Sequence, residues 1–121
     1  MPKESFLENR IKGVGYAFKG AWILIRSESS IQIQAVIAVV VTIAGIYYQI
    51  SAVEWIMQLL SIGLVMGVEG VTTAIEKLAD YIQPNHDPLI GKVKDISAGA
   101  VMIVSLIASI VGLIIYLPKI F

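Results

Sequence analysis

Two long uncharged segments limit what this chain can fold into. Residues 29–53 and 96–118 contain no Asp, Glu, Lys or Arg, and each exceeds the about 20 residues that a helix needs to cross a bilayer core. Hydrophobic residues make up 57% of the 121 residues and charged residues 15%, whereas soluble domains have about one half and one quarter. The sequence therefore predicts a small integral membrane protein.

A third apolar segment, residues 55–68, is too short to span a membrane alone. Continuing it through Ala74 gives a spanning length, with Glu69 inside the helix near one end. The helix should continue beyond the span to about Ile82, because no breaker precedes Pro84. The predicted transmembrane helices are about 31–49, 53–74 and 97–117.

Residues 5–26 have the pattern of an amphipathic helix. Apolar side chains recur there at steps of three and four, at Leu7, Ile11, Val14, Phe18, Ala21, Trp22 and Ile25. A basic amphipathic helix before a span most simply lies in the membrane interface, although packing against protein gives the same pattern. The expected fold is all-α, a single domain over residues 1–121 with a surface helix and three transmembrane helices.

The positions of the basic residues predict the orientation of the spans. Five lie in the N-terminal segment (Lys3, Arg10, Lys12, Lys19 and Arg26) and three between the second and third spans (Lys77, Lys92 and Lys94). The link between the first two spans has none. The positive-inside rule then places the N-terminus and the second link in the cytoplasm.

Small residues are spaced for close helix contact. Gly63 and Gly67 form a GxxxG motif, and Ala108 and Gly112 form a similar pair. Three helices expose most of their surface, so we expect a homo-oligomer packed through such faces.

Several chemistries are excluded or disfavoured. The chain has no cysteine, which excludes thiolate metal sites and a cysteine nucleophile. A formal net charge of zero gives no overall field for nucleic acid. No Walker phosphate loop and no protein-kinase signature occur. His86, the only histidine, lies between turn-forming residues and is more simply a solvated loop residue than a ligand.

Five polar residues share one face of the second predicted span and its extension. Glu69, Thr72, Thr73, Glu76 and Asp80 are offset by steps that return to the same side of a helix. Asp80 alone is more simply the solvated end of a helix. Glu69 is harder to explain in this way, because an ionisable group at such depth is costly and is a functional site by default.

A second carboxylate lies where the surface helix meets the first span. Glu28 there is either a helix N-terminal acid, favoured by the helix dipole, or a partner of Glu76. Two carboxylates near the cytoplasmic face suit Mg²⁺, which commonly uses one or two carboxylates plus phosphate oxygens. Lys94 and Asp95 are expected to start the third span, where a lysine and a helix N-terminus favour phosphate.

One segment carries a family resemblance. "EGVTTAIEKLAD" (69–80) resembles the E-x-x-N-[ST]-A-I-E-x-x-x-D hallmark of the small prokaryotic diacylglycerol kinase and undecaprenol kinase family. Further matches are "GYAFKGAW" (15–22), Glu28, "HDPLIGKVKDISAGAV" (86–101) and "GLIIYLPK" (112–119). The resemblance covers nearly the whole chain, and its tail is more similar to undecaprenol kinases.

The resemblance implies a homotrimer in the bacterial inner membrane that uses Mg²⁺ to transfer the γ-phosphate of ATP to the hydroxyl of diacylglycerol or undecaprenol. It implies shared active sites at the cytoplasmic boundary, with Glu69 as general base and Glu28 and Glu76 as metal ligands. The implied ATP-binding residues are Tyr16, Glu28, Glu76, Asn85, His86, Asp87, Lys94 and Asp95. The implied substrate-binding or site-shaping residues are Lys19, Trp22, Gln34, Gly70, Thr72 and Ser97.

Two positions depart from the family pattern. Thr72 replaces the usual Asn and so loses the reach and second donor of an amide. Gln34 is uncharged where relatives are often acidic or otherwise polar.

Two other classes of protein compete with the kinase. A small proton-coupled transporter would use Glu69 as its carrier carboxylate, although transporters place such groups near the midplane. A noncatalytic membrane assembly factor would use the charges only for oligomer register, which leaves the grouping of Glu28, Glu76, Lys94 and Asp95 unexplained.

Overall fold

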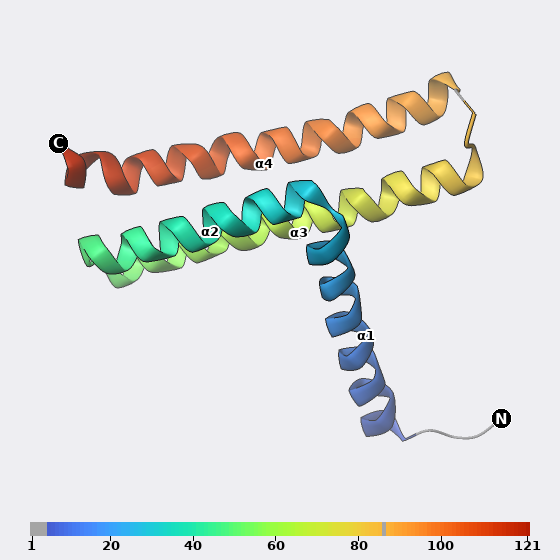
Figure 1. Cartoon of the computed structure of the whole chain (residues 1–121), viewed down its shortest axis with the longest axis horizontal. Coiled ribbons are helices and arrows are strands. Elements are labelled where there is room, and N and C mark those ends of the chain that lie inside the picture. Colours follow the sequence, from blue (N-terminus) through green and yellow to red (C-terminus); the bar gives the residue numbers. More distant parts are fainter. Residues whose placement is uncertain (1–4, 86) are drawn as a thin grey trace.

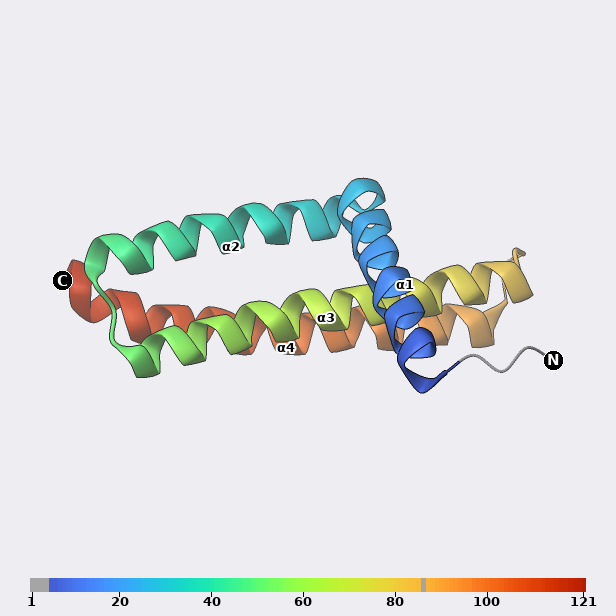
Figure 2. The same cartoon turned by 90° about the horizontal axis from the view of Figure 1, so that it is seen from below.

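The computed structural model describes residues 5–85 and 87–121. Over these residues the chain forms α1 (Phe6–Ser27), α2 (Ser29–Tyr48), α3 (Ala52–Ile82) and α4 (Pro88–Ile120). Helices α2, α3 and α4 run side by side, and α1 leaves them crosswise (Figures 1 and 2). Each of α2, α3 and α4 is long and apolar enough to cross a membrane. The predicted all-helical architecture with three candidate spans is confirmed.

Helix α4 begins earlier than the predicted span, which starts at about residue 97. The Asp87 carboxylate caps it by accepting two backbone amides of the first turn at 2.9 and 3.4 Å. Pro88 then takes the first helical position, where its missing N–H costs nothing. Lys94 and Asp95 therefore lie inside α4 and do not start it. Helix α3 ends at Ile82, as predicted.

Helices α3 and α4 form an antiparallel hairpin with one register along its length. The side-chain pairs that join them are Asp80–Lys94, Gln58–Tyr116 and Glu54–Lys119. We call the end of the hairpin at residues 83–87 the turn end. There α3 and α4 project beyond the start of α2 (Figures 1 and 2), so this end carries polar groups from two helices that α2 does not cover.

A sharp bend at Glu28 separates α1 from α2. Its backbone is extended (φ −107°, ψ 114°), so the residue ends one helix and begins the next. The Gln32 amide donates to the carbonyls of Ile25 and Arg26 at 3.0 and 3.1 Å, which satisfies groups that a helix end leaves free. The last turn of α1 then touches α3, because a Cβ on Gly70 would lie 3.0 Å from Leu24 Cδ1.

The opposite end of the molecule is fixed by the α2–α3 connection. Gln49 ends α2 in the left-handed conformation (φ 52°), and Ser51 and Glu54 form a capping box at the start of α3. Gly45 is buried against Trp55, so closely that a Cβ would lie 2.8 Å from Cη2 of the indole. This contact holds the first and second spans together at their joined ends.

The glycines expected to mediate close helix packing do not pack within the chain. Apart from the neighbouring residues and backbone of their own helix, no heavy atom of the described residues lies within 4 Å of where a Cβ on Gly63, Gly67 or Gly112 would stand. Most large apolar side chains of the spans are also exposed. Such surfaces are available to lipid or to other subunits, and the homo-oligomer stays a prediction.

Candidate functional site

The Glu69 side chain lies on α3 where the first turns of α2 run beside it. Gln34 of α2 donates from Nε2 to Glu69 Oε1 at 3.3 Å. The Thr72 hydroxyl, one turn further along α3, donates to the Glu69 carbonyl at 3.1 Å and lies 3.5 Å from Oε2. Gly70 follows directly and packs under Leu24 of α1. The structure thus brings together four residues that the sequence had singled out separately.

A second group of charges lies further toward the turn end. Glu28 makes an ion pair with Lys77 of α3 at 3.2 Å. Although Glu28 stands at the N-cap position of α2, its side chain makes no capping hydrogen bond there. The carboxylate instead reaches Lys77 of α3, the residue after Glu76. Lys77 therefore serves an interhelical contact, which the sequence analysis did not anticipate.

A third group lies at the turn end itself. Asp80 and Lys94 form an ion pair at 2.5 Å between side chains that are 60% and 43% exposed. Beside it is an open depression of about 280 Å³, lined by Gln83, Pro84, Asn85, Asp87, Ile90, Gly91 and Lys94. Three of the predicted nucleotide contacts, Asn85, Asp87 and Lys94, thus line one hollow. Since an exposed ion pair contributes little stability, Lys94 can exchange Asp80 for another anion at small cost.

The three groups follow α3 in order from half-buried to exposed. At 1.5 Å per residue, Glu76 and Asp80 lie about 10 and 16 Å beyond Glu69 along the helix axis. We call this row, with its partners Gln34, Glu28 and Lys94, the polar track. It can accommodate an extended charged molecule that approaches Glu69 from the turn end.

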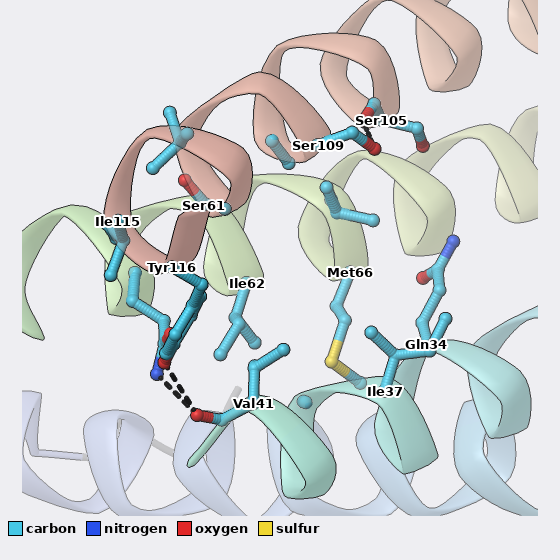
Figure 3. Close-up of a pocket in the computed structure, with 16 residues that line it drawn as sticks. Gln34, Ile37, Val41, Ser61, Ile62, Met66, Ser105, Ser109, Ile115 and Tyr116 are labelled. Atoms are coloured by element: carbon cyan, nitrogen blue, oxygen red, sulfur yellow. Dashed lines mark hydrogen bonds between the residues drawn. The ribbon is translucent and has the colours of Figure 1, made fainter. Parts of the chain in front are cut away.

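An apolar groove opens on the other side of Glu69, between α2, α3 and α4. It has a volume of about 260 Å³ and is lined by Gln34, Ile37, Ala38, Val41, Gln58, Ser61, Ile62, Val65, Met66, Ser105, Ala108, Ser109, Val111, Gly112, Ile115 and Tyr116. Figure 3 shows Gln34 at one end and Tyr116 at the other. Gln34 therefore belongs to both features, because its amide also contacts Glu69.

Part-buried hydrogen bonds close the far end of the groove. The single proton of the Tyr116 hydroxyl has two acceptors within reach, Gln58 Oε1 at 2.5 Å and the Val41 carbonyl at 3.0 Å, and Gln58 Nε2 donates to the same carbonyl at 3.1 Å (Figure 3). These contacts join one residue from each of the three spans. They hold the groove walls at a fixed separation.

The carboxylates of the polar track provide a limited set of metal ligands. Within residues 5–85 and 87–121 there is no group of three or more His, Cys, Asp or Glu side chains that could hold a metal ion. Glu28 reaches Lys77 of α3, the residue that follows Glu76, and carboxylates are oxygen ligands of the kind that Mg²⁺ prefers. Two carboxylates would be enough for a Mg²⁺ ion that completes its coordination with phosphate oxygens and water, and Glu28 would then release Lys77.

The remaining predicted residues are less closely connected. Tyr16, Lys19 and Trp22 are exposed along α1, Asp95 is exposed on α4, and Ser97 is buried on α4. His86 lies outside the described residues. The ion pair of Lys77 with Glu28 and the contact of Leu24 with Gly70 had no signal in the sequence. Both depend on how the end of α1 meets α3.

Comparisons with known proteins identify related chains. The family model for prokaryotic diacylglycerol kinase matches residues 15–116. The chain is 38% identical over 113 residues to the undecaprenol kinase of Bacillus subtilis (strain 168), covering 93% of this chain and 92% of that protein. It is 31% identical over 103 residues to the diacylglycerol kinase of Escherichia coli (strain K12), covering 83% and 82%.

Proposed function

Since the chain belongs to the prokaryotic diacylglycerol kinase family and is a membrane lipid kinase, we propose that it transfers the γ-phosphate of ATP to the hydroxyl of a membrane lipid alcohol, with Glu69 as general base. One observation carries the proposal. Glu69 lies between an apolar groove on one side and a row of charged residues on the other. A lipid alcohol and a nucleotide need this combination of surroundings at the point where they react.

The lipid chain of the acceptor lies in the apolar groove. The groove runs between the candidate spans, and its mostly apolar lining suits a hydrocarbon chain. It ends at Gln34, which contacts Glu69. A chain in the groove would therefore bring its terminal hydroxyl toward the carboxylate. The buried contacts of Tyr116 and Gln58 set the depth to which the chain can enter.

Glu69 takes the proton of the lipid hydroxyl as the reaction proceeds. The alcohol oxygen forms a bond to the γ-phosphorus, the bond from that phosphorus to the β,γ-bridging oxygen breaks, and ADP leaves. A base must be within hydrogen-bond reach of the proton that it removes. The half-buried position of Glu69 at the groove entrance supports this role.

The nucleotide occupies the polar track. Its base and sugar lie toward the depression at the turn end, and Lys94 pairs with a phosphate in place of Asp80. Glu28 and Glu76 would hold Mg²⁺, which offsets phosphate charge when it is bound. Phosphoryl transfer depends mainly on positioning and electrostatic stabilisation, so the absence of a Walker loop does not oppose the assignment.

The same proposal fixes the position of the chain in the membrane. The turn end and α1 face the cytoplasm of a bacterial inner membrane, because ATP comes from that side and the basic residues follow the positive-inside rule. Helix α1 lies in the interface, since its apolar stripe is exposed along its whole length. Exposed Gly63 and Gly67 on α3 suit contacts in a homotrimer.

Two lipid alcohols are the acceptors to compare. The relatives are named for undecaprenol and for diacylglycerol, and the higher identity to the undecaprenol kinase favours a polyprenol. The comparisons give no support to the transporter alternative.

The decisive assay incubates the purified protein in lipid bilayers with γ-labelled ATP and magnesium, offering undecaprenol or diacylglycerol separately. The proposal predicts label in undecaprenyl phosphate, in phosphatidic acid, or in both. Label in neither product, from protein that is folded and embedded in lipid, would refute it.

Blocking the groove tests where the lipid chain lies. Ala108→Phe projects a ring into the groove, whereas Leu106→Phe enlarges an exposed side chain of α4 outside it. We expect the groove variant to raise the KM for the lipid alcohol and to leave the KM for ATP unchanged. Equal effects of the two variants would remove the groove from the proposal.

A further inference from the structure

The hydrogen bonds to Glu69 differ in quality. Thr72 has one hydroxyl proton to donate, and its Oγ1 atom lies closer to the backbone carbonyl oxygen of Glu69, at 3.1 Å, than to Oε2 of the carboxylate, at 3.5 Å. Thr72 therefore orients the carboxylate weakly. Gln34 donates to the same carboxylate from the facing helix, at 3.3 Å, and the described residues give its Nε2 no second acceptor.

The other end of the Gln34 amide is unusual. Its Oε1 atom is buried and has no hydrogen-bond partner among the described residues, although buried polar atoms in proteins are nearly always paired. The residue also lines the apolar groove. An amide kept here at a cost in stability, beside an ionisable carboxylate, indicates a role that an apolar residue could not fill.

An amide can pair with a carboxyl group in both of its protonation states. While Glu69 is ionised, the Gln34 NH₂ group donates to it, as observed. Once Glu69 has taken a proton, it becomes a donor, and a half-turn of the amide presents the unpaired Oε1 as its acceptor. The Thr72 hydroxyl shares its one proton between the carboxylate and a backbone carbonyl. It therefore does not offer both a committed donor and a separate acceptor to Glu69.

We propose that Gln34 is the positioning residue of the Glu69 base and supplies the amide that this chain lacks at position 72. The inference rests on the proposed function and deepens it. The family motif has Asn at position 72, on the same helix as the base. In this chain the amide comes from α2 instead. The orientation of the Glu69 carboxylate therefore depends on the packing of α2 against α3.

The alternative is that Gln34 only ties α2 to α3. An interhelical tie affects stability and all kinetic constants through the fold, and moving the amide back to α3 would not repair its loss. A positioning role is local to Glu69. Its loss slows the chemical step, leaves ATP binding unchanged, and is corrected by an amide at position 72.

The experiment compares wild type, Gln34→Leu, Thr72→Asn and the double variant in lipid bilayers with labelled ATP and the lipid alcohol. We expect Gln34→Leu to lower kcat by about 10- to 100-fold, as for a misplaced reacting group, with the KM for ATP unchanged. The double variant should recover most of the loss. Unfolding of each variant in detergent shows whether it has folded.

Two results would overturn the inference. One is wild-type kcat in Gln34→Leu. The other is a folded Gln34→Leu whose lost rate Thr72→Asn does not restore. A wild-type protein that labels no lipid alcohol refutes the proposed function itself, and so is distinct from both.

A second variant covers the case in which Gln34→Leu does not fold. Gln34→Glu keeps the size of the side chain but replaces the N–H donor to Glu69 by a second carboxylate. Its kcat should fall with the KM for ATP unchanged, and Thr72→Asn should restore part of the loss. A wild-type kcat in Gln34→Glu would also contradict the positioning role.

Discussion

Tyr116→Phe tests how the groove is held open at its far end. The Tyr116 hydroxyl donates its one proton to Gln58 Oε1 at 2.5 Å, and the Val41 carbonyl lies 3.0 Å from the same hydroxyl. Gln58 is only 5% exposed, so water cannot easily replace the lost donor. The substitution therefore removes one of the hydrogen-bonded ties between α4 and the other spans and leaves the buried Gln58 acceptor unpaired.

The expected loss of stability follows from the contacts removed. Hydrogen bonds between membrane helices contribute about 0.6 kcal/mol on average and up to about 1.7 kcal/mol. A buried acceptor left without a donor costs about 1–3 kcal/mol in proteins generally. We expect Tyr116→Phe to lower the free energy of unfolding by about 1–2 kcal/mol, between these two ranges.

A double-mutant cycle separates the hydrogen bond from general packing. Gln58→Leu removes the acceptor that Tyr116→Phe would leave unpaired, so the double variant should lose less than the sum of the single losses by about 0.5–1 kcal/mol. Unfolding is measured in detergent micelles against rising denaturant. Tyr47→Phe is the matched control, because Tyr47 is 71% exposed. Additive losses, or a Tyr116→Phe variant as stable as the control, would refute the reasoning.

Three further predictions concern other parts of the chain. Gly45→Ala places a methyl group 2.8 Å from the Trp55 indole and should lower the free energy of unfolding by about 1–3 kcal/mol, whereas Gly63→Ala should leave the isolated subunit unaffected; denaturant unfolding checks both. Gln49→Gly removes the steric strain of a non-glycine residue in the left-handed conformation (φ 52°). It should raise the free energy of unfolding by up to about 1 kcal/mol. Glu76→Gln should raise the magnesium concentration that gives half the maximal rate, and a titration of rate against magnesium that matches wild type would exclude Glu76 as a ligand.

The spans and the shared polar face of α3 could be predicted from the sequence because their signals are local. Charge-free runs mark segments that can cross a bilayer, and the helical offset from Glu69 to Glu76 fixes a shared face whatever the tertiary structure. The helical extension to Ile82 followed from the lack of a breaker. Each of these features is set by the sequence of a single helix and does not require contacts with another helix.

The features that the sequence did not predict depend on contacts between helices. The pairing of Glu28 with Lys77 requires the bend that ends α1, and the pairing of Asp80 with Lys94 requires the hairpin register. The early start of α4 had a local signal in Asp87 and Pro88, but the turn formers around it favoured a longer loop. The groove has no local signal, since it exists only between three spans.

The dependence of lipid phosphorylation on Glu69 tests the central claim most directly. Initial rates are measured for wild type, Glu69→Gln and Glu8→Gln, each in bilayers with labelled ATP, magnesium and the accepted lipid alcohol. Glu8 lies exposed at the start of α1, and its variant should match wild type. Glu69→Gln should lower the rate by about 10²- to 10⁴-fold while the protein remains folded and assembled. A Glu69→Gln enzyme within a few-fold of wild type would contradict the account.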